Sequence, residues 1–168
     1  GYLLGRQATV RSALEPLAQA LSFDTVESDD RLAFRIRGRE AVATIDARDL
    51  LPLDARTAEA WRERRTQELE LPERLSVVHI DKDADFGQGT QSAKRVSASS
   101  PAGTTGSRHQ LSLQLPIVLD ATTAKRIAER TLVAAWLERS AYEAQLPPDR
   151  LALEPTDVID VVFPSGSA

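Results

Sequence analysis

Three aspartates alternate along the stretch "IDKDADFGQG", and they are the strongest candidates for chemistry in this sequence. Asp81, Asp83 and Asp85 precede a glycine, and alternating carboxylates before a glycine are typical of the start of a calcium-binding loop. The rest of the EF-hand pattern is missing, because Phe86 takes the place of the glycine and Ser92 takes that of the closing glutamate. Two interpretations stay open: a weak metal site, or an acidic turn after a strand, which turn preferences favour.

Patterns for other kinds of site are absent from the sequence. His79 and His109 are the only histidines, and there is no cysteine, so thiolate chemistry is excluded and no H-x-x-x-H metal spacing occurs. No G-x-S-x-G elbow presents a serine, and no glycine-rich phosphate loop is found. The residues alone predict no enzyme and no cofactor, and favour a structural or binding module.

Composition bounds the class of protein further. The formal net charge of −4 argues against nucleic-acid binding, which needs a surplus of Lys and Arg. No run of about 18 apolar residues occurs, so no membrane span is predicted. The apolar content of 42% is that of a globular chain with a core. Because the chain starts at Gly1 and lacks methionine, we expect a fragment of a longer protein.

Apolar periodicity predicts the elements that must position these residues. Helical spacing appears over residues 9–22, capped by Thr9, and over residues 121–141, capped by Asp120. Residues 58–71 fit a helix by composition and a solvated strand by their poor apolar stripe. Strands are predicted at 23–28 and 32–38 as a hairpin, and at 41–46, 74–81, 90–99, 109–119, 150–155 and 157–163. This order of elements predicts an α+β fold with mainly antiparallel pairing.

One cluster of side chains is a candidate protein interface. Trp61 stands beside Arg62 and Arg64 in the run "WRERR", and Trp and Arg are enriched at protein contacts. The competing interpretation is a solvated face of mixed charge. Trp136 and Tyr142, around the end of the long predicted helix, are interpreted as core or interface.

The stretch "LELPERLSVVHIDKDADFGQGTQSAKR" is similar to a segment of phage tail proteins. In those proteins an "LP" step leads to a strand ending in "ID", an acidic turn and "G-x-Q-x-A-x-R". The matching residues are Leu71, Pro72, Arg74, Ile80, Asp81, Gly89, Gln91, Ala93 and Arg95. Residues 113–163 continue the resemblance with an "LP" strand, a helix bearing Trp136 and Arg139, and "LPP". One departure is Thr156, where the family often has a glycine.

On these residues the chain is identified as a member of the phage tail protein family that includes tail-tip and baseplate hub proteins of siphophages and gene transfer agents. That family carries a TIM-barrel-like domain upstream. The resemblance implies a small helix-and-hairpin lobe over residues 1–53. It implies an antiparallel, barrel-like hub domain over residues 54–168, with the helix 121–141 packed on it.

The resemblance also implies a role. The chain would be a structural part of the virion tail tip, assembled in the bacterial cytoplasm, and would link the tail tube to host-binding parts. Its partners would be other tail proteins, the rest of its own chain and further copies in a homotrimer, with no catalysis. The acidic turn would then be structural or would face a neighbouring subunit.

Two other function classes stay open at this point. A calcium- or carbohydrate-binding module of a secreted or surface protein would bind calcium at the three aspartates and present an aromatic platform, for which only Trp61 is a strand aromatic. A hydrolase would depend on His79 or His109 as a base.

Overall fold

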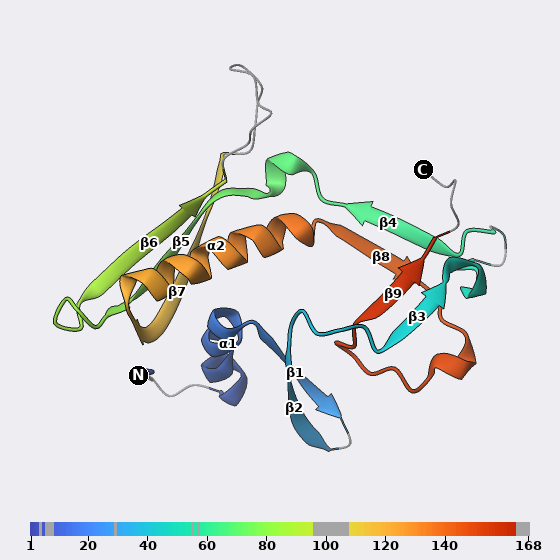
Figure 1. Cartoon of the computed structure of the whole chain (residues 1–168), viewed down its shortest axis with the longest axis horizontal. Coiled ribbons are helices and arrows are strands. Elements are labelled where there is room, and N and C mark those ends of the chain that lie inside the picture. The colour runs from blue at the N-terminus through green and yellow to red at the C-terminus, as the bar shows by residue number, and fades with distance from the viewer. Residues whose placement is uncertain are drawn as a thin grey trace. The chain divides into compact units, whose positions relative to one another are not determined.

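Two compact units, each built from two separate stretches of the chain, make up the computed structural model (Figure 1). Unit 1 comprises Gly1–Leu21 and Arg65–Arg139, and unit 2 comprises Ser22–Arg64 and Ser140–Ala168. The structure describes residues 1–3, 5, 9–28, 30–54, 56, 58–95 and 108–163, so the end of the predicted strand 90–99 lies outside the described residues. The division differs from the predicted boundary after residue 53, because the N-terminal helix packs with the later sheet.

A three-stranded sheet in the order β6-β5-β7 forms the base of unit 1. The strands β5 (Pro72–Asp81) and β6 (Gln88–Lys94) are an antiparallel hairpin, and β7 (His109–Leu119) runs parallel to β5. On the outer edge of β7, Tyr2 bridges to Ile117. No strand among the described residues pairs with the outer edge of β6.

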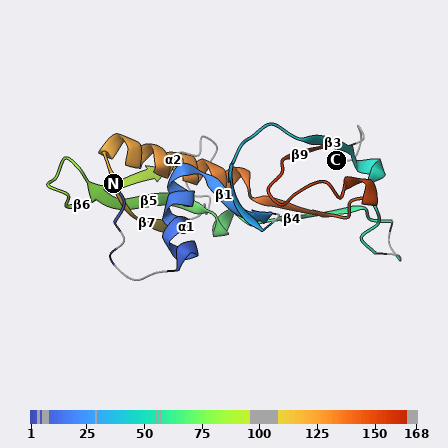
Figure 2. The ribbon, with the colours of Figure 1, turned by 90° about the horizontal axis from the view of Figure 1, so that it is seen from below.

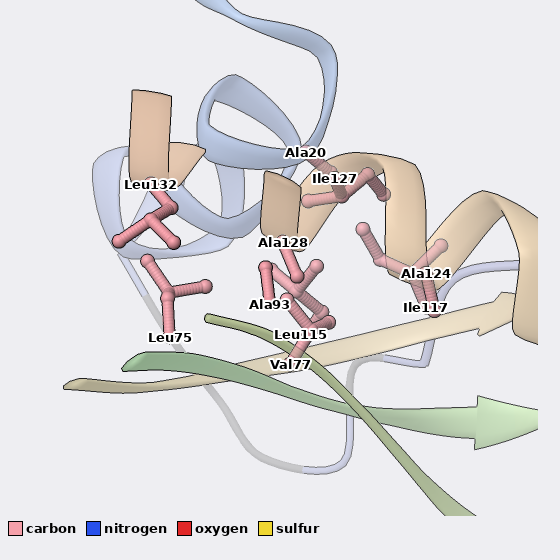
Figure 3. Close-up of a cluster of buried hydrophobic side chains, with 10 residues drawn as sticks. All are labelled: Ala20, Leu75, Val77, Ala93, Leu115, Ile117, Ala124, Ile127, Ala128 and Leu132. Carbon is pink, nitrogen blue, oxygen red and sulfur yellow. The ribbon is translucent and has the colours of Figure 1, made fainter. Parts of the chain in front are cut away.

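The helices α1 (Val10–Leu21) and α2 (Ala121–Leu137) cover one face of this sheet. In β5 the predicted alternation is confirmed, since Leu75, Val77 and His79 are buried while the intervening residues are partly exposed. Figure 3 shows the resulting core between sheet and helices, made of Ala20, Leu75, Val77, Ala93, Leu115, Ile117, Ala124, Ile127, Ala128 and Leu132. α2 packs on β5 and β6, whereas α1 packs on β7.

Both predicted helix caps are confirmed. The hydroxyl of Thr9 accepts a hydrogen bond from the Ser12 amide at 3.2 Å. The Asp120 carboxylate accepts from the amide and the hydroxyl of Thr123, both at 2.8 Å. These bonds satisfy donors that a helix leaves free at its first turn. They also hold the pKa of Asp120 below its usual value, chiefly through the amide of Thr123.

In its described residues, unit 2 contains three separate strand pairs. The predicted hairpin is confirmed as β1 (Phe23–Ser28) antiparallel to β2 (Arg31–Ile36). The strands β3 (Ala43–Asp46) and β9 (Ile159–Val162) lie side by side in parallel (Figures 1 and 2). The third pair is β4 (Trp61–Arg65) with β8 (Ser140–Ala144), whose arrows point in opposite directions in Figure 1. The small core of unit 2 is formed by Ile45, Ala47 and Leu50 with partly buried neighbours.

The predicted barrel is wrong, and the predicted mainly antiparallel pairing holds only in part. The sheets of the described residues have two or three strands each and do not close into a barrel. Two of the pairs, β3–β9 and β5–β7, are parallel. Parallel neighbours need a long crossover connection, so the alternation within each strand could not reveal them. The fold of the described residues is mixed α/β, mostly strands with two α-helices.

Three predicted element boundaries also change. α2 ends at Leu137 instead of residue 141, because the following residues leave helical geometry and form β8. Residues 150–155, predicted as a strand, instead finish a 3-10 helix (Pro148–Arg150) and enter a turn. The ambiguous stretch 58–71 contains a strand, β4, and a 3-10 helix (Glu68–Glu70). A further 3-10 helix (Ala47–Asp49) follows β3.

Candidate interaction surfaces

The acidic turn, residues 82–86, joins β5 to β6 and is held by the backbone on either side of it. The Asp81 amide donates to the Gly87 carbonyl at 2.8 Å, and the Gly87 amide donates to the Ala84 carbonyl at 2.7 Å. The Asp81 carboxylate accepts from the Asp83 amide at 2.9 Å. Each of these bonds is one that a tight turn makes for itself.

The carboxylates of the turn point to water. Asp83 and Asp85 are exposed, and within the described residues neither forms an ion pair. No group of three or more His, Asp or Glu side chains that could hold a metal ion occurs in that part of the chain. Asp85 and Phe86 have left-handed backbones, with φ of 50° and 58°, a conformation that costs energy for residues with side chains. Phe86 is 67% exposed, so the turn presents an aromatic ring together with two carboxylates.

The two histidines differ in surroundings. His79 is buried, with 2% exposure, and no described residue forms a hydrogen bond with either ring nitrogen. A Cβ added to Gly89 would lie 2.8 Å from Cε1 of His79, so the imidazole fills the space above that glycine. His109 is exposed at the start of β7. The position of His79 is that of a packing residue under the helix layer.

In unit 2 the structure joins the predicted interface residue Trp61 to two other aromatic rings. The ring centroid of Trp61 lies 4.9 Å from that of Phe163 and 6.0 Å from that of Tyr142. Tyr142 and Phe163 are themselves 6.5 Å apart. The Trp61–Phe163 contact is edge-on, at an interplanar angle of 60°. Trp61 also packs against the small core of unit 2, so it anchors this aromatic cluster and faces water only in part.

The two predicted arginines lie on β4 beside that cluster. Arg62 pairs with Glu59 at 3.3 Å and with Glu143 at 3.7 Å, while Arg64 is exposed and forms no ion pair within the described residues. Trp61 and Arg62 line a groove of about 560 Å³ in unit 2, together with Ala47, Arg48, Ala58, Glu59, Ala60 and Glu63. Exposed ion pairs contribute little to stability, so the pairs of Arg62 add little to the stability of unit 2.

Unit 1 carries a second groove, which the sequence did not predict. The Arg95–Trp136 groove has a volume of about 620 Å³ and is lined by Ala93, Lys94, Arg95, Glu129, Leu132, Val133, Trp136, Leu137 and Arg139. It lies where β6 ends beside the C-terminal half of α2. Val133 and Leu137 are 57% and 77% exposed, and they give the groove an apolar wall open to water.

Trp136 is held by a backbone hydrogen bond and stacks against the guanidinium group of Arg95 in the Arg95–Trp136 groove. Its Nε1 donates to the carbonyl of Pro72 at 2.9 Å, and the guanidinium carbon of Arg95 lies 3.4 Å from the centre of its ring system. Such a cation–π contact holds the guanidinium flat and leaves its edge free to bind a carboxylate. Lys94 and Arg139 are already paired with Glu73 and Glu68. Arg95 has no ion pair in the described part of the chain.

The two residues that give this groove its name are far apart in the sequence, and the sequence singles out each of them for a different reason. From the sequence, Trp136 is interpreted as core or interface, and Arg95 belongs to the stretch that resembles tail proteins. Trp136 is partly buried against the core of unit 1, as one of its two interpretations expects, but no local pattern relates residues so far apart in the chain. The cation–π contact that joins them exists only in the folded unit.

The chain is similar to proteins of phage tails and of a gene transfer agent particle. A family model described as "Putative phage tail protein" matches residues 9–167. The curated proteins contain no match. Among solved structures, the chain is similar to one described as "Virion of native gene transfer agent (GTA) particle". The TM-score is 0.83 at 27% sequence identity, over 98% of this chain and 35% of that chain. The chain thus spans about a third of the length of that virion protein.

Proposed function

The chain belongs to the phage tail protein family whose model matches residues 9–167, and we propose that it is a structural part of a tail tip or baseplate hub. In this role it links the tail tube of a phage or gene transfer agent to the parts that bind the host. The family membership supports a structural role in a tail. The finer placement at the distal end is our proposal.

One observation carries this proposal. The likeness to a chain of a gene transfer agent virion extends over 98% of the present chain, at a TM-score of 0.83. A match of that extent includes both units and the connections between them, and it exceeds what a single shared strand–helix motif would give. A virion component also needs surfaces for its neighbours, and each unit has a groove lined by Trp and Arg side chains.

The mechanism we propose is assembly without catalysis. Protein interfaces draw most of their binding energy from a few buried aromatic and Arg residues, and Trp61 and Trp136 are such residues here. Around the tail axis we propose a homotrimer that also contacts other tail proteins and the rest of the same chain. Each contact would be individually weak, so that stable association depends on several contacts forming together.

A carbohydrate-binding module is the second candidate, and one observation favours it. Trp61, Tyr142 and Phe163 gather on unit 2, whereas the sequence offered only Trp61 for an aromatic platform. The rings meet at angles of 41° to 60°, so they do not form one flat surface for a sugar. Titration of the chain with glycans of the host surface, followed by tryptophan fluorescence, tests this candidate directly.

Immunogold electron microscopy on particles from the producing strain tests the tail-tip role. The antibody is raised against this chain, and antibody pre-absorbed with the same chain serves as the control. Gold at the distal end of intact tails is the expected result. Intact tailed particles without gold, with the protein found only in cells or medium, would contradict the proposal.

A further inference from the structure

We propose that unit 1 carries two complementary surfaces through which copies of this chain join head to tail. The acidic turn of one copy, with Asp83, Asp85 and Phe86, docks in the Arg95–Trp136 groove of the next copy. This inference deepens the proposed assembly role by naming a contact for the ring of copies. It rests on three observations: matched unpaired charges, matched exposed apolar side chains, and the separation of the two surfaces within one copy.

The charges of the two surfaces are complementary. In the described residues, Asp83 and Asp85 form no ion pair, and Arg95 holds its guanidinium on Trp136 without a carboxylate partner. Lys94 and Arg139, the other cations of the groove, are already neutralised by glutamates. A carboxylate entering the groove therefore meets Arg95, whose flat guanidinium can bind it through two hydrogen bonds.

A second pair of opposite charges has its cation in the turn and its anion in the groove. Lys82 lies in the acidic turn, and Glu129 lines the groove. Both are exposed, and within the described part of the chain neither forms an ion pair, although the charge of Lys82 contributes to the lowered pKa of nearby Asp120. Docking would bring Lys82 toward Glu129 while Asp83 and Asp85 meet Arg95. Two pairs of opposite sign fix an orientation better than one pair does.

The apolar side chains of the two surfaces also match. Phe86 projects from the turn on a left-handed backbone, where a glycine would be the unstrained choice. The groove offers Val133 and Leu137 at its open wall. An exposed aromatic side chain gains most when it enters a concave apolar site that excludes water. The strained backbone of the turn then has a use, which is to direct the Phe86 ring outward.

An acidic turn that docks in this groove must come from another copy. The acidic turn precedes the first residue of β6, and the groove lies at its last residue, Lys94. A strand of this length spans roughly 20 Å, so the turn cannot reach the groove of its own copy. A contact between two different surfaces of identical copies is heterologous, and repetition of such a contact closes a ring or continues as a filament.

Sedimentation equilibrium of the chain over a wide concentration range tests the contact. We expect reversible self-association that is weakened at least tenfold by Phe86→Ser and by Arg95→Glu. Two matched controls, Leu151→Ser and Arg31→Glu, change an exposed side chain of the same type in unit 2 and should leave the association unchanged. Circular dichroism verifies that each variant is folded.

Charge reversal in trans makes the test specific. A chain with Arg95→Glu and a chain with Asp83→Lys and Asp85→Lys should each fail to self-associate, because like charges meet in the contact. Their equimolar mixture should regain association, because the reversed turn of one matches the reversed groove of the other. If Arg95→Glu fails to fold, the turn variant, which lies at the far end of β6, still tests the contact.

Crosslinking provides an independent readout, since the chain has no cysteine of its own. A mixture of Asp85→Cys and Leu137→Cys chains should form a mixed disulfide under mild oxidation, in preference to either symmetric disulfide. A monomeric wild-type chain without this disulfide would overturn the contact, as would self-association that Phe86→Ser and Arg95→Glu leave unchanged. Either result leaves the immunogold test of particle location unaffected, so the two proposals can fail separately.

Discussion

The two units differ in how they keep their shape. Unit 1 places two helices on a three-stranded sheet and buries ten side chains in one continuous core. Among its described residues, unit 2 consists of three strand pairs, and its three buried core residues, Ile45, Ala47 and Leu50, pack against side chains of β4 and β9. Isolated two-stranded pairs are marginally stable in water. The comparison indicates that unit 1 is stable through its own packing, whereas unit 2 depends more on what it contacts.

The largest expected effect tests this difference in packing. Leu75 and Ile45 are both buried almost completely, in unit 1 and unit 2 respectively. We expect Leu75→Ala to lower the free energy of unfolding by about 3 to 4 kcal/mol, and Ile45→Ala by only about 2 kcal/mol, because a small core collapses more easily around a lost side chain.

Urea unfolding followed by tryptophan fluorescence measures both effects. The chain has two tryptophans, Trp61 in unit 2 and Trp136 in unit 1, so Trp61→Phe and Trp136→Phe backgrounds report on one unit each. Equal losses from the two substitutions would remove the distinction between the units.

A medium effect is expected inside unit 1, where β6 meets β5. Gly89→Ala should destabilise the chain by about 2 kcal/mol, because the new Cβ would lie 2.8 Å from Cε1 of the buried His79. In a chain that already carries His79→Ala, the additional loss of stability from Gly89→Ala should be much smaller, because the imidazole ring that the new Cβ would contact is gone. A double-mutant cycle measures this coupling, and additive effects of the two substitutions would contradict the close contact.

The smallest effects are expected at two capping carboxylates, one in each unit. Asp120 caps α2, and Asp46 caps the three-residue helix after β3. Asp120→Ala should lower the melting temperature by a few degrees, and Asp46→Ala by less, because a three-residue 3-10 helix has far fewer backbone hydrogen bonds for its cap to support than the 17-residue α2. Thermal melts of both variants at neutral pH measure the difference, and an equal or larger loss for Asp46→Ala would reverse this order.

The pH dependence of the Asp46 contribution follows from its pKa. Hydrogen bonds from the Arg48 side chain and backbone lower the pKa of Asp46 to about 2. A carboxyl whose pKa is lowered by folding stabilises the folded state above its ordinary pKa of about 3.9, and that contribution is lost as the pH falls through about 2. Between pH 4 and 2 the wild type should therefore lose stability relative to Asp46→Ala, as shown by converging melting temperatures.

The elements that could be predicted from the sequence are those with a local pattern. The alternation of Leu75, Val77 and His79 predicted the buried face of β5, and Asp120 predicted the start of α2. The turn interpretation of the acidic stretch needs only neighbouring residues, and the structure forms that turn. Each of these signals arises from residues that lie only a few positions apart in the sequence.

The features that could not be predicted depend on residues far apart in the chain. The parallel pairing of β3 with β9 joins Ile45 to Val161, and no periodicity relates two such segments. The same holds for Trp61, whose ring partners Tyr142 and Phe163 come from the end of the chain. The barrel-like expectation failed for this reason, since pairing partners and sheet closure are properties of the whole fold.

The discontinuous units determine the order in which the chain can fold as it is synthesised. Unit 1 has all its elements once residue 139 has been made, but β3 must wait for β9, which ends at Val162. At the usual speed of translation this wait lasts about 6 to 23 seconds. During that time a short strand with a buried Ile45 has no partner of its own, which makes unit 2 the part of the nascent chain most exposed to chaperones and to misassembly.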